Sequence, residues 1–211
     1  MSGVAIYMEG GGRGPDTRAA LRRGMDALLG PVKRAARDKS LRWKLICCGP
    51  RDEALRGFRN AARNGEAAIV LLLVDAEGPV ATGPCEHLHA RDGWDMRGVD
   101  ATSVHLMAQT MEAWIVADAD ALGRYYGQGF NAGALPRAVD LESVAKQDLE
   151  RALRRATDGT RKGRYRKIED ASDLLQRIDA ERVKARCRHC RRLFDELGGM
   201  IDAARGKAVA R

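Results

Sequence analysis

Three short apolar runs in the first 75 residues establish the main pattern of this chain. They cover residues 4–8 (VAIYM), 41–49 (LRWKLICCG) and 69–74 (IVLLLV). The continuous run 69–74, which is followed by Gly and Pro, predicts a strand buried on both faces, as in a parallel sheet, and the other two runs predict further strands. The segments between the runs, 15–31 and 51–65, have helical spacing, and a Gly-Pro pair closes the first of them. Strands and helices alternate, so we expect an α/β fold with an open, mainly parallel sheet flanked by helices.

The remainder of the chain has helical patterns and loops. Residues 78–100 are polar and lack periodicity, which predicts a loop of functional importance or high mobility. A helix is predicted over 103–118, because Met107, Met111 and Trp114 recur at helical spacing. After a loop rich in Gly and Asn, further helices are predicted at about 141–156, 171–178 and 181–197.

Charge is distributed unevenly along the chain. Residues 151–211 contain 18 Lys and Arg against 9 Asp and Glu, a net of +9, whereas the first 150 residues contain 19 against 20, a net of −1. A neutral module followed by a basic one suggests nucleic acid as partner, although a solvated basic surface would give the same count. We expect a metal-binding α/β core over 1–135 and a basic helical accessory region over 136–211.

Two absences in the sequence bear on location. The amino terminus lacks the basic and apolar segments of a signal peptide, and no run approaches the ~20 apolar residues of a membrane span. We therefore expect a cytoplasmic protein without a membrane partner. The five cysteines are an odd number, which agrees with free thiols in a reducing compartment.

One cysteine pair, Cys187 and Cys190, has the CxxC spacing of metal ligands. A structural zinc needs four ligands, and no second CxxC or HxxxH follows. His189 and the Cys47-Cys48 pair could in principle complete such a set across the fold. We expect Cys187 and Cys190 instead to be small apolar residues on a helix.

The candidate chemistry lies at the ends of the first and third predicted strands. Glu9 follows the first strand, and Asp75 and Glu77 follow the third. Parallel strands place such residues at one edge of the sheet, where three carboxylates would repel one another unless a cation neutralised them. Ligands that are all oxygen select a hard ion, so the sequence predicts a Mg²⁺ or Mn²⁺ site.

Other polar residues are candidates for supporting roles. Glu112 lies in an otherwise apolar helical stretch, where an uncompensated acid is costly to bury, so we expect it to face the site as a direct or outer ligand. The histidines His87, His89 and His105 are candidates for a general base or for ligands of a softer metal. Asp92 and Asp95 in the motif RDGWD are candidates for outer ligands.

The glycines after Glu9 permit two interpretations. Gly10, Gly11 and Gly12 could form a phosphate-binding turn, or a tight turn that clears space around Glu9. The chain lacks the GK[ST] of a Walker loop and a GxGxxG in register for a dinucleotide, so we favour the tight turn.

A basic segment, RKGRYRK, occupies residues 161–167. Its cations are expected to contact phosphates and its tyrosine to stack on a base, unless the segment is a solvated loop. The predicted nucleic-acid-binding residues are Arg161, Lys162, Arg164, Tyr165, Arg166 and Lys167.

The order IYMEGGG, then LLLVDAEGP some 65 residues later, resembles the Toprim arrangement of topoisomerases, primases, a ribosomal-RNA maturase and the overcoming-lysogenization-defect nucleases. With the later motifs EHL, RDGWD, MEAW and YGQGF, the chain is similar to a family of small bacterial Toprim-like proteins of uncharacterised activity, often encoded beside an SMC/ABC-type ATPase. Asp-x-Glu stands here where Asp-x-Asp is commoner.

The resemblance implies a Toprim-like fold and a metal-dependent nuclease. Glu9, Asp75 and Glu77 would hold metal for phosphodiester chemistry, Glu112 would assist, and the ATPase would be a partner in a defence-type system. The first alternative is a catalytically degenerate module that binds nucleic acid or a partner as a sensor or inhibitor. An enzyme acting on a nucleotide or small phosphate ester is the second alternative.

Overall fold

The computed structural model describes residues 2–12 and 14–204, so the last seven residues of the predicted basic region lie outside the described part. It shows an α/β fold with an open sheet of four parallel strands in the order β2-β1-β3-β4. The strands are β1 (Gly3–Met8), β2 (Arg42–Cys47), β3 (Ile69–Asp75) and β4 (Val104–Met107). The predicted fold class and the first three strands are confirmed.

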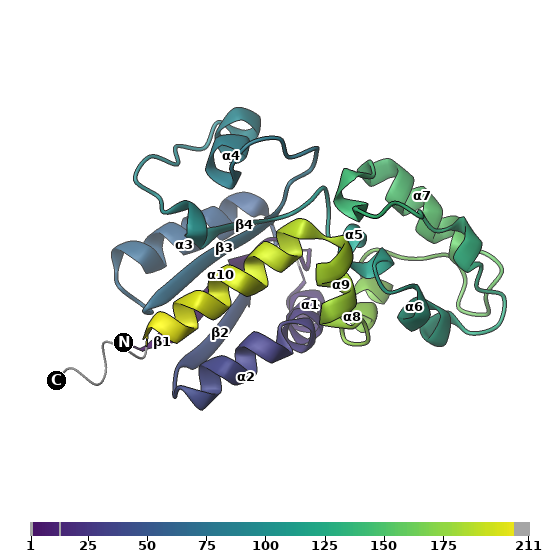
Figure 1. The fold of residues 1–211 in the computed structure, drawn as a ribbon, viewed down its shortest axis with the longest axis horizontal. Helices are drawn as coiled ribbons and strands as arrows, with labels where there is room; N and C mark the ends of the chain where they lie inside the picture. Colours follow the sequence, from purple (N-terminus) through teal and green to yellow (C-terminus); the bar gives the residue numbers. More distant parts are fainter. Residues whose placement is uncertain (1, 13, 205–211) are drawn as a thin grey trace.

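Helices flank both faces of this sheet (Figure 1). Their bounds are α1 (Pro15–Leu28), α2 (Gly30–Asp38), α3 (Arg51–Arg63), α4 (Pro84–Asp92), α5 (Glu112–Val116), α6 (Ala119–Tyr126), α7 (Lys146–Thr157), α8 (Glu169–Leu175), α9 (Ala180–Arg186) and α10 (Arg188–Ala204). Short 3₁₀ turns occur at Ala101–Ser103, Ala132–Ala134 and Leu141–Ser143.

The alternation of side chains along β1 explains the two layers. Val4, Ile6 and Met8 face a core formed with α1, α2 and α10, whereas Ala5 and Tyr7 face a second core formed with α3 and α4. All six positions of β1 are buried, as expected for a central strand covered on both sides.

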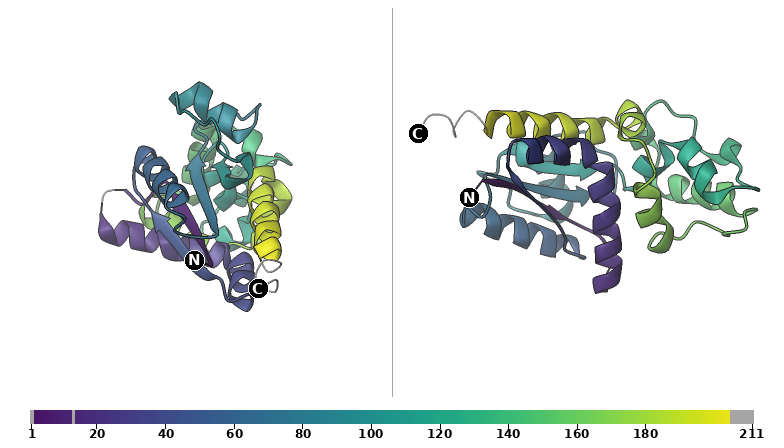
Figure 2. Two further views of the ribbon diagram at one scale, coloured as in Figure 1. Left: turned by 90° about the vertical axis from the view of Figure 1, so that its left-hand side faces the viewer. Right: turned by 90° about the horizontal axis from the view of Figure 1, so that it is seen from below.

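The later helices adjoin the carboxyl ends of the strands, and α10 then returns along the sheet (Figures 1 and 2). Leu193, Leu197 and Ile201 of α10 are buried in the same apolar cluster as β1. The expected division near residue 135 stays a prediction, but residues from both sides of it share this cluster.

The helix predicted over 103–118 is wrong for its first half. Residues Val104–Met107 form β4, which pairs with β3, and the helix α5 begins only at Glu112. All four residues of β4 are buried because α4 and α10 cover its two faces. A strand buried on both faces lacks the alternation of apolar and polar residues that identifies other strands, and the spacing of Met107, Met111 and Trp114 matched that of a helix.

Three other boundaries differ from the predictions. Gly30 and Pro31 do not end the helical region but begin α2, because proline is well accommodated in the first helical turn. The polar segment 78–100 contains α4, whose end is set by Gly93 in the left-handed conformation. The helix predicted over 181–197 is divided at Cys187, which is extended.

Among the described residues, no helix is both long enough and apolar enough to cross a membrane.

The contact between α1 and α8 depends on a glycine. A Cβ at Gly24 would lie 2.7 Å from the Ser172 carbonyl oxygen, whereas a Cβ at Gly198 in α10 would meet nothing within 4 Å. We expect Gly24→Ala to lower the free energy of unfolding by about 1–3 kcal/mol through overpacking. Gly198→Ala should raise it by about 0.5–1 kcal/mol, because alanine favours the helix. Chemical denaturation measures both, and equal effects would contradict the close α1–α8 contact.

Candidate metal centre

The predicted acidic residues lie where the connections of the sheet diverge. From β1 the chain passes over one face to β2, and from β3 it passes over the other face to β4. Between the carboxyl ends of β1 and β3 the crossovers leave a crevice, which is the usual ligand site of open α/β sheets. Glu9 follows β1 and Asp75 ends β3, so both lie at this crevice.

Backbone pairing fixes the two carboxylates against each other. The Glu9 amide donates to the Leu73 carbonyl at 2.9 Å, and the Asp75 amide donates to Oε2 of Glu9 at 3.1 Å. The Met111 amide donates to Oδ1 of Asp75 at 3.0 Å. Asp75 is 8% exposed, so these contacts position an almost buried acid.

Glu77 completes the group from the loop after β3. Its backbone has φ +61°, and its amide donates to the Gln109 carbonyl at 2.7 Å, which turns the chain back towards the site. One carboxylate oxygen from each of Glu9, Asp75 and Glu77 lies within 4.8 Å of the others. The structure thus brings the three predicted metal ligands together.

Two cations outside the predicted site contact its carboxylates. Nη1 of Arg51 lies 3.7 Å from Oε2 of Glu9, and Nζ of Lys146 lies 2.5 Å from Oε2 of Glu77. Arg51 also bonds Asp92, which connects that predicted outer ligand to the site indirectly. The sequence around Arg51 and Lys146 gives no sign that either residue belongs to the site. Lys146 begins α7 and lies 69 residues after Glu77 in the chain.

The donor set fits a hard divalent cation. It consists of three carboxylates, two of them partly exposed to the cavity, with no nitrogen or sulfur ligand. Mg²⁺ and Mn²⁺ prefer such oxygen ligands, and carboxylates this close need positive charge among them. Lys146 pairs with Glu77 and Arg51 lies near Glu9, whereas the Asp75 carboxylate accepts a hydrogen bond from the uncharged Met111 amide.

The electrostatics of the group differ between its members. Burial, and next the charge of Glu9, raise the pKa of Asp75 to about 7. Burial also raises the pKa of Glu9, although Arg51 opposes that shift. Burial would raise the pKa of Glu77 as well, but the hydrogen bond from Lys146 holds it below its usual value. A protonated Asp75 is therefore a substantial form of the protein near neutral pH.

Glu112 lies behind the carboxylates rather than beside them. It is fully buried and accepts hydrogen bonds from the Thr110 hydroxyl at 2.5 Å and the Tyr165 hydroxyl at 3.1 Å. Nζ of Lys167 lies 3.4 Å from its Oε2. The Thr110 hydroxyl is also 3.5 Å from Oδ2 of Asp75, so Glu112 acts on the site through its neighbours.

A cavity of about 310 Å³ adjoins the acidic group. Lys167 and the three carboxylates line it, together with the glycine turn Gly10–Gly12. All three glycines have positive φ, and a Cβ at Gly10 or Gly11 would lie 2.8 Å from α1. The Gly10 amide bonds the Gly49 carbonyl, so the turn packs closely and leaves space beside Glu9.

The basic segment 161–167 is less available than predicted. Tyr165 is 5% exposed and bonds Glu112, so its ring cannot stack on a base, and this prediction is wrong. Arg164 pairs with Asp158, and Arg166 pairs with Asp170. Arg161 and Lys162 are exposed, while Lys167 lines the cavity beside the three carboxylates. The segment was predicted as a uniform basic surface, but it consists of a buried tyrosine, two arginines in ion pairs, one lysine at the cavity and two exposed cations.

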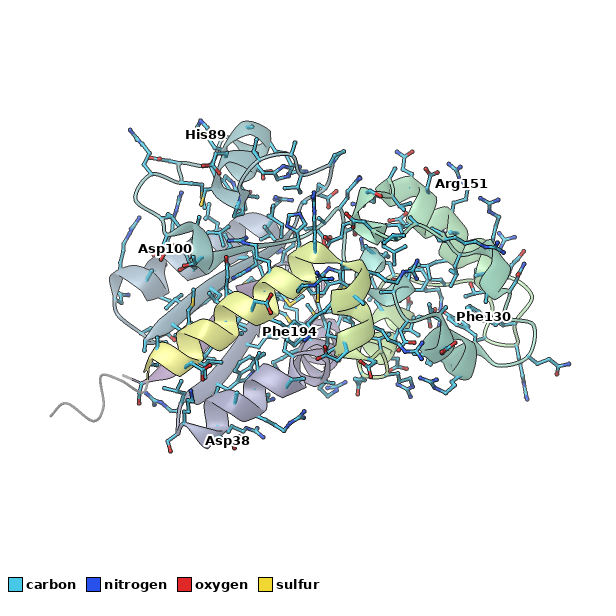
Figure 3. All side chains as sticks on the ribbon, in the orientation of Figure 1. Asp38, His89, Asp100, Phe130, Arg151 and Phe194 are labelled. Carbon is cyan, nitrogen blue, oxygen red and sulfur yellow. The ribbon has the colours of Figure 1, made fainter. Side chains whose placement is uncertain are left out.

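The predicted histidines do not line the cavity. Nε2 of His87 lies 2.9 Å from the Ala76 carbonyl, and Nδ1 of His89 lies 3.0 Å from the Trp94 carbonyl. Figure 3 places His89 on the outside of α4. His105 is buried in β4, where burial lowers its pKa to about 3. Exposed Asp95 pairs with Arg97, away from the acidic group.

Cys187 and Cys190 are fully buried, and burial raises the pKa of both thiols. The Cys187 thiol donates to the Ala113 carbonyl. Within residues 2–12 and 14–204, the group of Glu9, Asp75 and Glu77 is the one acidic, His or Cys cluster with metal-ligand spacing. Their burial agrees with the expectation that both are small apolar residues, but only Cys190 lies on a helix, because Cys187 is extended between α9 and α10.

Comparison with known proteins shows the family of the chain. A family model described as a domain of unknown function, DUF4276, matches residues 17–198, and the chain belongs to this family. The matched range includes Asp75, Glu77 and Lys167, whereas Glu9 and the glycine turn precede it. No curated protein and no solved structure matches the chain.

The raised pKa of Asp75 predicts a pH-dependent stability in the metal-free protein. The pKa of an aspartate in the unfolded chain is about 4, whereas that of Asp75 in the folded protein is about 7, so the folded state binds the proton more tightly. The stability that this proton contributes is present below about pH 4 and is lost as the pH rises through about 7. Asp75→Asn removes the charge and should therefore raise Tm relative to the wild type at pH 8 more than at pH 4.5.

Both measurements require a chelator, so that no metal stabilises the wild type. Asp95→Asn serves as the control, because Arg97 holds the pKa of exposed Asp95 below its usual range and the substitution should bring no gain at pH 8. An Asp75→Asn gain that is the same at both pH values would contradict the raised pKa.

Proposed function

We propose that this protein is a divalent-metal-dependent phosphodiesterase that cleaves nucleic acid in the cytoplasm, with an SMC/ABC-type ATPase as partner in a bacterial defence-type system. The observation that supports the chemistry best is the convergence of Glu9, Asp75 and Glu77 within 4.8 Å at the crevice of the sheet. The ATPase partner rests on the motif resemblance alone.

Glu9, Asp75 and Glu77 would hold Mg²⁺ or Mn²⁺. When bound, such an ion polarises a phosphate and lowers the pKa of a water ligand, which supplies a nucleophile at neutral pH. Metal binding favours the ionised form of Asp75, so affinity should increase with pH up to about 7. The tight glycine turn keeps side chains away from Glu9 and leaves room for a phosphate group.

Lys167 supplies the cation of the cavity. Burial would lower its pKa, but the charges of Glu112 and Asp75 outweigh burial and raise it, so the ammonium stays protonated. Glu112 is fixed by Thr110 and Tyr165, and it holds the Lys167 ammonium at the cavity wall. In this position the ammonium can donate to a non-bridging phosphate oxygen and stabilise developing negative charge.

A binding module with a non-catalytic site is the second candidate. The observation that favours it is the ion pair of Lys146 with Glu77, which neutralises one predicted ligand without any metal. Such a module would bind nucleic acid or a partner and show no metal-dependent cleavage. The two functions therefore differ in one measurement.

Cleavage of labelled oligonucleotides with Mn²⁺ or Mg²⁺, and with EDTA, provides that measurement. We expect metal-dependent cleavage that Asp75→Asn reduces by about 100-fold or more, because several kcal/mol of charge stabilisation would be lost. Asp95→Asn, an exposed acid paired with Arg97, is the matched control and should cleave like the wild type. Binding without cleavage by the wild type would favour the non-catalytic module.

The role of Lys167 is tested with inorganic phosphate and Mn²⁺. Lys167→Met should weaken phosphate binding by about tenfold or more, which is the size of a charge-assisted hydrogen bond, and Lys167→Arg should retain most of it. Lys162→Met is the control from the same segment, because its ammonium lies over the Tyr125 ring. Equal phosphate affinities of Lys167→Met and Lys162→Met in calorimetry would refute the assigned role.

A further inference from the structure

The cavity beside the carboxylates has two chemically different walls. Glu9, Asp75, Glu77 and Lys167 form an ionic wall, and apolar side chains line another part of the cavity as an apolar wall. The apolar wall consists of Leu21 from α1, Met107 at the end of β4, Met111 just before α5, Ile168 just before α8 and Ala171 within α8. The metal chemistry uses the ionic wall alone and leaves the apolar wall without a role.

Ile168 gives the apolar wall an unusual feature. It is 55% exposed, and the other large apolar side chain exposed in the described part of the chain is Val139, which lies outside the cavity. Ile168 directly follows Lys167, the cation of the ionic wall. A ligand whose charge meets Lys167 would therefore present its neighbouring atoms to Ile168, and burying that side chain would be favourable.

The size of the cavity limits the ligand. A volume of about 310 Å³ is at the lower end of the range of ligand pockets, so it accepts one small unit rather than a stretch of double helix. In a duplex the bases are stacked and paired, and the outer surface offers phosphates and sugars. An unpaired nucleotide can instead rotate its base onto an apolar side chain while its phosphate meets cations.

We infer that the cavity binds one unpaired nucleotide, with its phosphate towards Lys167 and the carboxylates and its base against the wall formed by Ile168, Met111 and Leu21. This inference rests on the proposed function and specifies its substrate class as single strands or unpaired ends. Tyr165 takes no part in stacking because it is buried, so the base contact is aliphatic. Such a contact predicts little discrimination among the four bases.

The test compares deoxyadenosine 5′-monophosphate with inorganic phosphate as ligands of the full chain in saturating Mn²⁺. The wild type should bind the nucleotide about tenfold more tightly, because only the nucleotide reaches the apolar wall. Ile168→Ser should remove most of this difference while phosphate and Mn²⁺ affinities stay unchanged. Ile168 is the N-cap residue of α8, a position that serine favours, so the helix should persist.

Val139→Ser is the matched control, because it replaces the other exposed large apolar side chain and should leave every affinity unchanged. Equal binding of nucleotide and phosphate by the wild type, or equal effects of Ile168→Ser and Val139→Ser, would overturn the inference. A duplex that competes with the nucleotide as well as a single strand of the same sequence would also overturn it.

The two proposals fail in different ways. If Mn²⁺ does not bind, or binds equally to Asp75→Asn, the metal centre is wrong. If Mn²⁺ and inorganic phosphate bind but the base adds no affinity, the metal centre stands and the nucleotide assignment is wrong.

Discussion

The mutual repulsion of Glu9, Asp75 and Glu77 is the constraint on which the arrangement of the site depends. Two unit charges 4.8 Å apart repel by roughly 3 kcal/mol at an effective dielectric constant of 20. The sheet forces this proximity, because the backbone pairing of β1 with β3 places both strand ends at one crevice. The fold must therefore compensate the charge, and it does so with Arg51, Lys146 and a raised pKa at Asp75.

These compensations draw distant segments of the chain to the site. Arg51 begins α3 and contacts both Glu9 and the Asp75 carbonyl, while Lys146 begins α7 and reaches Glu77. Lys167, which lies just before α8, pairs with Glu112, and its charge acts against the rise in the pKa of Asp75. The acids thus come from the ends of β1 and β3 and the loop that follows β3, whereas the cations come from the starts of α3 and α7 and the segment before α8.

The sequence predicted the sheet and its acids because those features are local. The strands β1 and β3 are each one apolar run, and the acid that follows or ends each of them is recognised without information from elsewhere in the chain. The strand β4 could not be recognised, since its burial depends on α4 and on α10, which returns some 85 residues later. Because its neighbours are basic, Tyr165 was predicted to lie on the surface. Its hydroxyl instead donates a hydrogen bond to the buried Glu112, and the local sequence gives no sign of this contact because the two residues are 53 positions apart.

The basic charge of the carboxyl-terminal part is also altered by contacts with distant residues, which the local sequence does not reveal. Many of its cations have structural partners: Arg182 pairs with Asp118 and Asp120, Arg192 bonds carbonyls near β4, and Arg186 bonds carbonyls near residue 137. The net charge of +9 therefore overstates the free cations of the described residues. Surface ion pairs contribute little to stability, whereas Lys167 pairs with the fully buried Glu112. Recognition of a polyanion would on this basis depend less on total charge than on Lys167, which lines the cavity beside the carboxylates.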